Sequence, residues 1–166
     1  SAGWNVHEEA FFKDSKFAEV VSLIKPRISY GLNGNVNGIG NFDVYGKYGS
    51  VGAYNGNLGY LNTGVVNSKL RWEKSHTFEL GLDLGFFNNR IHMIMDYYDR
   101  TTSDLLTDVN LPEYTGFPSF KTNLGTISNR GFELEAKVNL LTRKDWSWDV
   151  TANTSFVKNM VKKAAF

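Results

Sequence analysis

The stretch HTFELGLDLGFFNNRIHMIMDYYD, residues 76 to 99, decides the fold class of this chain. In its first half, every second residue is large and apolar, and the residues between them are small or acidic. A period of two places these two sets on opposite faces of a β-strand. The apolar set is Phe78, Leu80, Leu82, Leu84 and Phe86. The opposite set is Thr77, Glu79, Gly81, Asp83 and Gly85. The function then depends on what the apolar face contacts.

Two asparagines, Asn88 and Asn89, separate this strand from a second alternating segment and predict a tight hairpin turn. In the second strand one face carries Ile91, Met93, Met95 and Tyr97, and the other carries His92, Asp96 and Tyr98. A similar hairpin follows near the C-terminus, where RGFELEAKVNLL and WSWDVTANTSFVKN alternate on either side of TRKD. The sequence therefore predicts two hairpins, each with one apolar face and one polar face.

Long connections alternate with these short turns. A glycine- and asparagine-rich segment covers residues 34–75, and a second segment with Pro112, Gly116 and Pro118 covers residues 102–129. Connections of this length are uncommon in compact domains, and they usually have a function or some structure of their own. Short turns and long loops therefore alternate along the chain.

The N-terminal part predicts two more strands with a helix between them. SAGWNV alternates like the end of a strand, so the chain is expected to be a truncated piece of a longer one, and RISYGLNGN alternates in the same way. Between them, four apolar residues stand at helical spacing, which predicts a short amphipathic helix near residues 14–24 that Pro26 ends. These residues are Phe17, Val20, Val21 and Ile24.

Composition excludes several classes of protein. Of 166 residues, 18 are Lys or Arg and 17 are Asp or Glu, so a net charge of +1 gives no basic footprint for nucleic acid. The chain has no cysteine, which removes disulfides, thiolate metal sites and cysteine nucleophiles. No run approaches the ~18 apolar residues of a membrane helix. This does not exclude a membrane barrel, because the sequence pattern of a barrel strand is alternation over about ten residues.

Either a second protein layer or lipid has to cover the apolar faces. Lipid is favoured because aromatic residues gather at the strand ends and because short turns alternate with long loops, as in outer-membrane barrels. The aromatic residues are Phe78, Phe86, Tyr97, Tyr98, Trp146, Trp148 and Phe156. A sheet of about six strands has two open edges, and the unpaired backbone groups of an open edge are not tolerated in lipid. We therefore expect one segment, residues 1–166, from the C-terminal part of a larger barrel.

Five stretches together resemble one family over nearly the whole chain. They are SAGWNVHEEAFFK, RISYGLNGN, KLRWEKSHTFELGLDLGFFNNRIHMIMDYYDRTTSDLL, TGFPSFKTNLGTISNRGFELEAKVNLL and WSWDVTANTSFVKNMVKKA. In this order they are similar to the C-terminal half of the barrel of SusC/RagA-type TonB-dependent outer-membrane transporters of Bacteroidetes. The resemblance implies an all-β antiparallel segment of a barrel of 22 strands. The plug domain and the first half of the barrel are then expected to be absent.

The resemblance also implies a function. Such transporters import oligosaccharides or peptides across the cell outer membrane, with energy from the TonB complex acting through the absent N-terminal part, and with a SusD-like surface lipoprotein as partner. This fragment alone is expected to transport nothing. Two alternatives stay open from the residues: a soluble β-sandwich that binds carbohydrate, and a small complete barrel of about eight strands.

The sequence offers no strong catalytic or metal site, and we expect neither enzymatic activity nor a cofactor. His7, His76 and His92 lack ligand spacing, and paired carboxylates about 7 Å apart on one strand face suit a solvated lumen better than acid–base chemistry. The expected lumen-facing residues are Glu79, Asp83, His92, Asp96, Glu133 and Glu135. Aromatic loop residues are the candidates for contact with a ligand or partner, although packing of the loops on themselves explains them as well. They are Tyr45, Tyr48, Tyr54, Tyr60, Tyr114 and Phe117.

Overall fold

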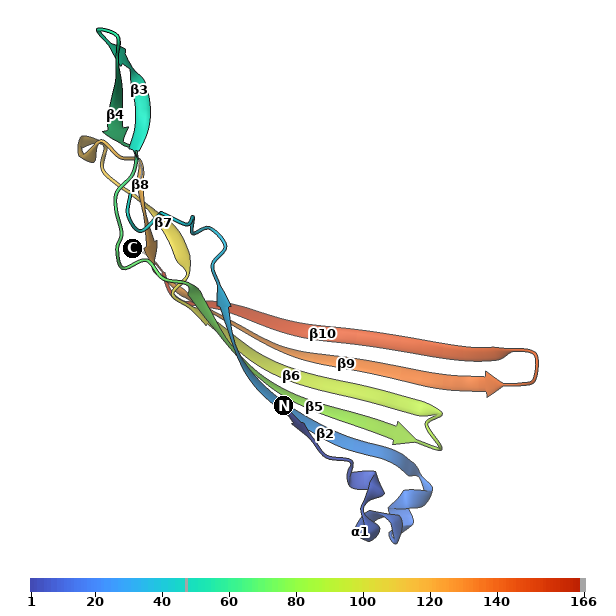
Figure 1. Cartoon of the computed structure of the whole chain (residues 1–166). Helices are drawn as coiled ribbons and strands as arrows, with labels where there is room; N and C mark the ends of the chain where they lie inside the picture. The colour runs from blue at the N-terminus through green and yellow to red at the C-terminus, as the bar shows by residue number, and fades with distance from the viewer. Residues whose placement is uncertain (47, 165–166) are drawn as a thin grey trace. The chain divides into compact units, whose positions relative to one another are not determined.

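A computed structural model describes residues 1–46 and 48–164 of the chain. Six strands form one antiparallel sheet in the order β1-β2-β5-β6-β9-β10 (Figure 1). Their bounds are Ala2–Gly3, Val21–Asn35, Glu73–Phe86, Ile91–Ser103, Thr126–Thr142 and Ser147–Lys163. Except for two small hairpins, each strand lies beside the next one along the chain. This confirms the predicted all-β, up-and-down arrangement.

The two predicted short turns are present. Between β5 and β6, Phe87, Asn88 and Asn89 all have positive φ angles, of 54°, 56° and 62°. Asparagine tolerates this left-handed conformation better than most residues, which explains the asparagine pair at the turn. Between β9 and β10, the N–H of Arg143 donates to the carbonyl of Trp146 at 2.9 Å.

The long connections contain small hairpins of their own. Residues between β2 and β5 form β3 (Tyr48–Tyr54) and β4 (Asn57–Asn62), a two-stranded sheet joined at Asn55 and Gly56. These two residues have φ angles of 48° and 80°, as an Asn-Gly turn requires. Residues between β6 and β9 form β7, the 3-10 turn η3 and β8. Their bounds are Leu106–Asn110, Glu113–Thr115 and Ser119–Asn123.

The helix predicted near residues 14–24 is only partly right. Helical structure begins earlier and is broken into three short turns: η1 (Val6–Glu8), α1 (Ala10–Lys13) and η2 (Lys16–Glu19). From residue 21 the chain is already in β2, so Pro26 lies inside a strand and ends no helix. Val21 and Ile24, counted above in one helix face, are β-branched residues with higher strand propensity and lie in β2 instead.

Contacts divide the chain into two compact units, which are described separately. One unit consists of Ser1–Leu32, His76–Arg100 and Ser128–Met160, and holds most of the six-stranded sheet. The other, called the loop unit, consists of Asn33–Ser75, Thr101–Ile127 and the chain from Val161 onward. Among the residues that the structure describes, no hydrophobic side chain is buried. No helix in this part is long and apolar enough to cross a membrane.

Candidate functional site on the polar face and in the loops

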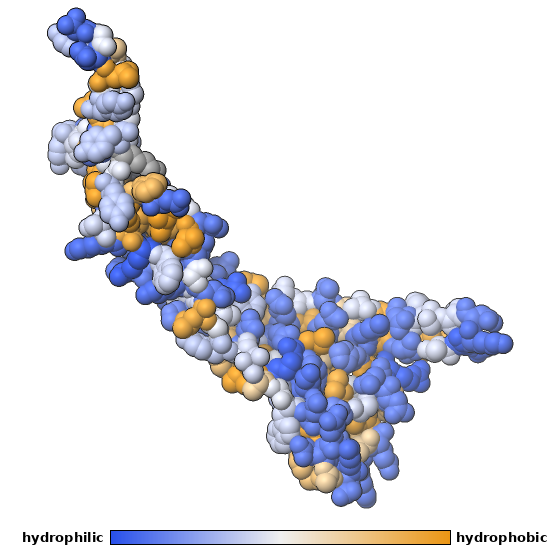
Figure 2. Space-filling view, in the orientation of Figure 1, coloured by the Kyte–Doolittle hydropathy of each residue, from blue (hydrophilic) through white to orange (hydrophobic). Residues whose placement is uncertain are grey.

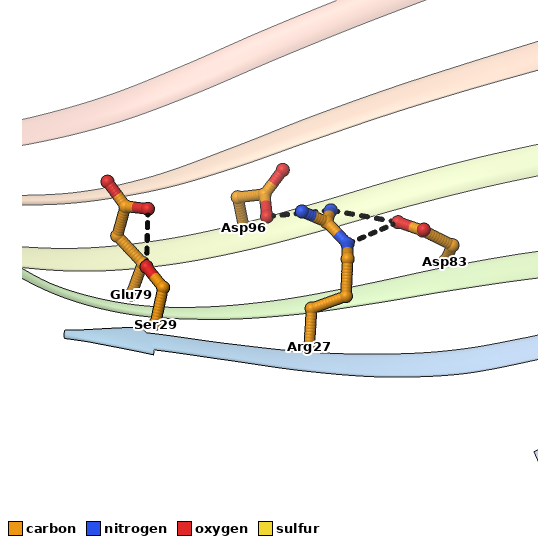
Figure 3. A network of polar contacts seen from close by, with 5 residues as sticks. All are labelled: Arg27, Ser29, Glu79, Asp83 and Asp96. Atoms are coloured by element: carbon orange, nitrogen blue, oxygen red, sulfur yellow. Dashed lines mark hydrogen bonds and ion pairs between the residues drawn. The ribbon is translucent and has the colours of Figure 1, made fainter. Parts of the chain in front are cut away.

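A cluster of charged side chains joins three neighbouring strands on one face of the sheet (Figure 3). From β2, Arg27 donates two hydrogen bonds to Oδ1 of Asp83 on β5, from Nε at 3.1 Å and from Nη2 at 2.8 Å. Its Nη2 also donates to Oδ1 of Asp96 on β6 at 3.0 Å. Arg27 therefore connects β2 both to the adjacent strand β5 and to β6, the strand after it. We call these three residues the arginine bridge.

A glycine makes the arginine bridge possible. Gly81 lies on β5 between Arg27 and Asp96, and a Cβ atom added there would come within 2.6 Å of Asp96 Oδ1 and 2.8 Å of Arg27 Cζ. Both distances are shorter than real Cβ atoms show. A side chain at position 81 would therefore separate the two charged groups, and their ion pair depends on the glycine.

Other contacts extend the same polar face over both hairpins. Within the sheet unit, side chains on alternate residues of neighbouring strands bond to one another. The pairs are Ser29 Oγ to Glu79 Oε2 at 2.9 Å, Arg100 Nε to Thr77 Oγ1 at 3.3 Å, and Asn139 Nδ2 to Asp149 Oδ1 at 2.9 Å. The alternation read from the sequence therefore assigns these residues to the correct face. In Figure 2 hydrophilic side chains predominate over much of the sheet in this view.

Open hollows lie on the polar face, two of them around residues expected to line a lumen. One has a volume of about 620 Å³ and is lined by Asp96, Glu133, Glu135 and Asn153, among others. The second, of about 590 Å³, is lined by His92 together with Lys137, Asn139 and Asp149. The six residues expected to line a lumen thus share one face, and its central part is acidic.

The opposite face is apolar and uncovered in this chain. Leu80, Tyr97 and Phe132 on it are 43%, 40% and 38% exposed. Polar pairs appear on this face toward the ends of the strands that lead into the long connections. Tyr30 Oη lies 3.1 Å from His76 Nδ1, and Arg130 Nε lies 2.8 Å from Asp99 Oδ2. The apolar stretch is therefore bordered by paired polar groups at that end.

The loop unit is held together by amide and lysine side chains that the sequence did not single out. Asn123 Nδ2 donates to the carbonyls of Arg71 and Asp104 at 2.6 and 2.8 Å, and its Oδ1 accepts the N–H of Arg71 at 2.8 Å. Lys121 Nζ donates to the carbonyl of Gly38 at 2.7 Å. Asn67 and Lys121 border a pocket of about 330 Å³. No alternation or motif marks these residues, because their partners are backbone groups of distant segments.

The aromatic candidates in the loops are exposed and dispersed. Tyr48 and Tyr60 lie on one face of the β3–β4 hairpin, because Tyr48 pairs with Asn62 and Ser50 pairs with Tyr60. Tyr54, at the tip of the hairpin, is 88% exposed. The remaining candidates lie outside the hairpin: Tyr45 in the turn before it, Tyr114 in η3, and Phe117 after η3. The described residues thus bring Tyr48 and Tyr60 to one surface and leave the others apart.

The chemistry of these groups is that of binding. Within residues 1–46 and 48–164, no three His, Asp or Glu side chains gather so as to hold a metal ion. Glu133 and Glu135 stand on the open polar face beside Asp96, around a hollow that is open to solvent. Such a surface can hold polar groups of a ligand or of another protein segment by hydrogen bonds and charge.

Comparison with known proteins identifies the family. A family model described as TonB dependent receptor-like, beta-barrel matches residues 17–165. The chain belongs to this family of TonB-dependent receptor barrels. It is 37% identical over 163 residues to TonB-dependent receptor P3 of Formosa agariphila, covering 96% of this chain and 16% of that receptor. It is 34% identical over 169 residues to TonB-dependent receptor SusC of Bacteroides thetaiotaomicron, covering 97% of this chain and 16% of SusC.

A solved structure has the same fold over this region. The structure titled as that of the RagAB peptide transporter matches with a TM-score of 0.86 and 31% identity, over 99% of this chain and 18% of the matched chain. The resemblance to SusC/RagA-type transporters is therefore confirmed. This chain spans about a sixth of the length of the curated relatives that it matches. Its sheet, with β1 and β10 at the two ends of the strand order, does not close. The alternative of a small complete barrel is therefore wrong for this chain.

Proposed function

We propose that residues 1–166 form part of the wall of a TonB-dependent importer in the cell outer membrane. In this proposal the apolar face contacts lipid and the polar face, with the arginine bridge, lines the lumen. The chain is one segment of the C-terminal part of the barrel, and both compact units belong to it. Glu79, Asp83, His92, Asp96, Glu133 and Glu135 are then lumen residues.

One observation carries this proposal: the sheet has a polar face crossed by hydrogen bonds and an apolar face that no other part of the described chain covers. The polar contacts join β2, β5 and β6, and again β9 and β10, and no hydrophobic side chain among the described residues is buried. A soluble β-sandwich needs a second sheet against its apolar face. The described residues form no second layer there, which disfavours the carbohydrate-binding sandwich as the alternative.

The proposed substrate is an oligosaccharide or a peptide, taken up together with a SusD-like surface lipoprotein. Two relatives support this class. One is SusC, and the other is the peptide transporter of the RagAB structure. The β3–β4 hairpin supplies a surface for a substrate or for the lipoprotein. Residues 48–68 contain no charged side chain, while tyrosine and asparagine recur, which suits stacking and amide hydrogen bonds. The remaining contact candidates, Tyr45, Tyr114 and Phe117, stay proposals of the same kind.

A growth experiment tests the proposed function. A strain that lacks the complete transporter is complemented with the wild-type gene and grown on single oligosaccharides or on peptide mixtures as the sole carbon source. We expect growth on one nutrient class to require both the transporter and TonB. Growth on every nutrient without the transporter, or growth that survives loss of TonB, would contradict TonB-dependent import.

A further inference from the structure

The connection between β1 and β2 is far longer than the other turns at the same edge of the sheet. This connection lies at the same end of the strands as the β5–β6 and β9–β10 turns (Figure 1). Those two turns need only residues 87–90 and 143–146, whereas residues 4–20 connect β1 to β2 and contain three helical turns. A hairpin reversal needs about two to five residues. The extra length of residues 4–20, which we call the N-terminal connection, therefore needs another explanation.

The N-terminal connection exposes large apolar side chains. Trp4 is 52% exposed, Phe11 62%, Phe17 72% and Val20 43%. Phe12 on α1 is half-buried, so the helical turns have an inner side that packs and an outer side that does not. Figure 2 shows apolar side chains on the surface in the region where Figure 1 places α1. A soluble turn would rarely expose so many aromatic rings close together.

Strand register places part of this surface on the apolar side of the sheet. Ala2 pairs with Ile28, and the next hydrogen bond along the pair runs from the N–H of Trp4 to the carbonyl of Pro26 at 3.1 Å. Trp4 therefore shares a face with Ala2 and Ile28, which is the apolar face. The ring of Phe11 lies against Trp4, with 6.3 Å between the ring centroids. The aromatic pair Trp4–Phe11 thus continues the apolar face beyond the strands.

Hydrogen bonds fix the N-terminal connection at several points. Trp4 Nε1 donates to Glu9 Oε1 at 2.9 Å, and His7 Nδ1 lies 3.4 Å from the carbonyl of Ile24. At the other end, the carbonyl of Val20 accepts the N–H of Phe87, in the β5–β6 turn, at 2.7 Å. The segment is thus attached to β2 and to the neighbouring turn. Its exposed rings are presented from a supported position.

We propose that the N-terminal connection is a membrane-surface anchor, whose outer side lies in the lipid headgroup region at the short-turn end of the barrel. This rests on the proposed function, because it needs the apolar face of the sheet to contact lipid. Amphipathic turns with Trp and Phe on one side bury that side about 5–10 Å into the headgroup boundary. Acidic residues outnumber lysines here, since Glu8, Glu9, Asp14 and Glu19 stand against Lys13 and Lys16. Apolar contact, and not attraction to anionic lipid, therefore holds the segment to the bilayer.

Residues 1–166 contain no cysteine, so single-cysteine variants of the complete protein, with any cysteine outside this segment replaced, test the anchor directly. Phe11→Cys carries an environment-sensitive fluorophore in nanodiscs of phosphatidylethanolamine and phosphatidylcholine. Lys13→Cys, also exposed and on the same helical turn, is the matched control. Leu80→Cys on the apolar face of β5 reports whether the sheet itself contacts lipid. Each label is challenged with aqueous iodide and with lipids that carry a nitroxide either near the headgroup or in the middle of the acyl chain.

We expect iodide to quench the label at position 11 severalfold less than the label at position 13, and nitroxide lipid to quench position 11 severalfold more. Equal quenching at positions 11 and 13 by both agents overturns the anchor. Protection of position 11 from both quenchers also overturns it, because a protein then covers the segment. If position 80 escapes nitroxide quenching, the lipid-facing sheet itself is wrong. Quenching at position 80 without quenching at position 11 rejects the anchor alone.

Discussion

Replacing Gly81 with alanine should destabilise the barrel wall, whereas the same change at Gly31 should not. Both glycines lie on the polar face, in neighbouring strands, and neither has a positive φ angle. A Cβ at position 31 meets nothing within 4 Å. A Cβ at position 81 meets the carboxylate of Asp96 at 2.6 Å and the guanidinium of Arg27 at 2.8 Å. The two substitutions therefore differ in that only the one at position 81 disturbs the arginine bridge.

The size of the difference follows from the contacts that are lost. The alanine at 81 must push Arg27 and Asp96 apart, which removes an ion pair of 3.0 Å and disturbs the two bonds to Asp83. The side chains of Arg27 and Asp96 are 39% and 37% exposed, so water screens their pairing. An exposed pair contributes about 0.2–1 kcal/mol, and the ends of these two flexible side chains can move aside with little further strain. The change from glycine to alanine reduces the entropy of both unfolded chains equally, by roughly 0.4–1 kcal/mol. We expect G81A to be about 0.2–1 kcal/mol less stable than G31A.

Urea unfolding of the complete protein in lipid vesicles, followed by tryptophan fluorescence and heat-modifiable gel mobility, measures this difference. A double-mutant cycle isolates its cause. In a background with Arg27→Ser and Asp96→Ser, the methyl group at position 81 meets no charged groups, so the extra cost of G81A should disappear. Equal stability of G81A and G31A, or a cost that persists in the double-serine background, would refute the dependence of the arginine bridge on Gly81.

Three further substitutions test the two faces and the loops. Leu82→Arg on the apolar face should destabilise folding in lipid vesicles by about 2–4 kcal/mol, whereas Asn153→Arg on the polar face should be tolerated; equal costs in urea titrations would contradict the lipid assignment. Gly131→Ala should lower stability, because its Cβ would come within 2.5 Å of the Tyr98 ring, and Tyr98→Ala should relieve that cost. Tyr54→Ala should leave stability unchanged, since the side chain is 88% exposed, but weaken substrate or lipoprotein binding in pull-down and uptake assays.

Alternation in the sequence is sufficient to predict the strands of the six-stranded sheet, their faces and the two short turns. Residues such as Glu79 and Asp96 could be assigned to the polar face without any coordinates, because a period of two fixes the side of a strand. The β3–β4 hairpin had a local signal as well, the Asn-Gly pair at 55 and 56, which is the turn that such hairpins prefer. The glycines around this pair favour a loop over strands, so the pair alone does not predict β3 and β4.

Alternation alone does not predict which side chains of the polar face contact one another. Periodicity says that Arg27 shares a face with Asp83, but only the register and order of the strands place it within reach of Asp96 as well. The helix predicted near residues 14–24 is only partly right for a related reason. Helical spacing in a short window competes with pairing to a neighbouring strand, and Val21 and Ile24 of the predicted helix face belong to β2.

The glycines of the polar face acquire a role only in this context. Glycine inside a strand normally weakens it, because it leaves no side chain to pack. Here neighbouring side chains occupy the space above three of them: Arg27 and Asp96 above Gly81, Asn89 and Leu23 above Gly85, and Tyr98 above Gly131. A wall whose apolar side faces lipid gains no cohesion by burying that side against protein, so its strands depend on backbone ladders and on side chains that cross the polar face. Each of these glycines leaves room for side chains from neighbouring strands, so each glycine position is a point of contact between strands.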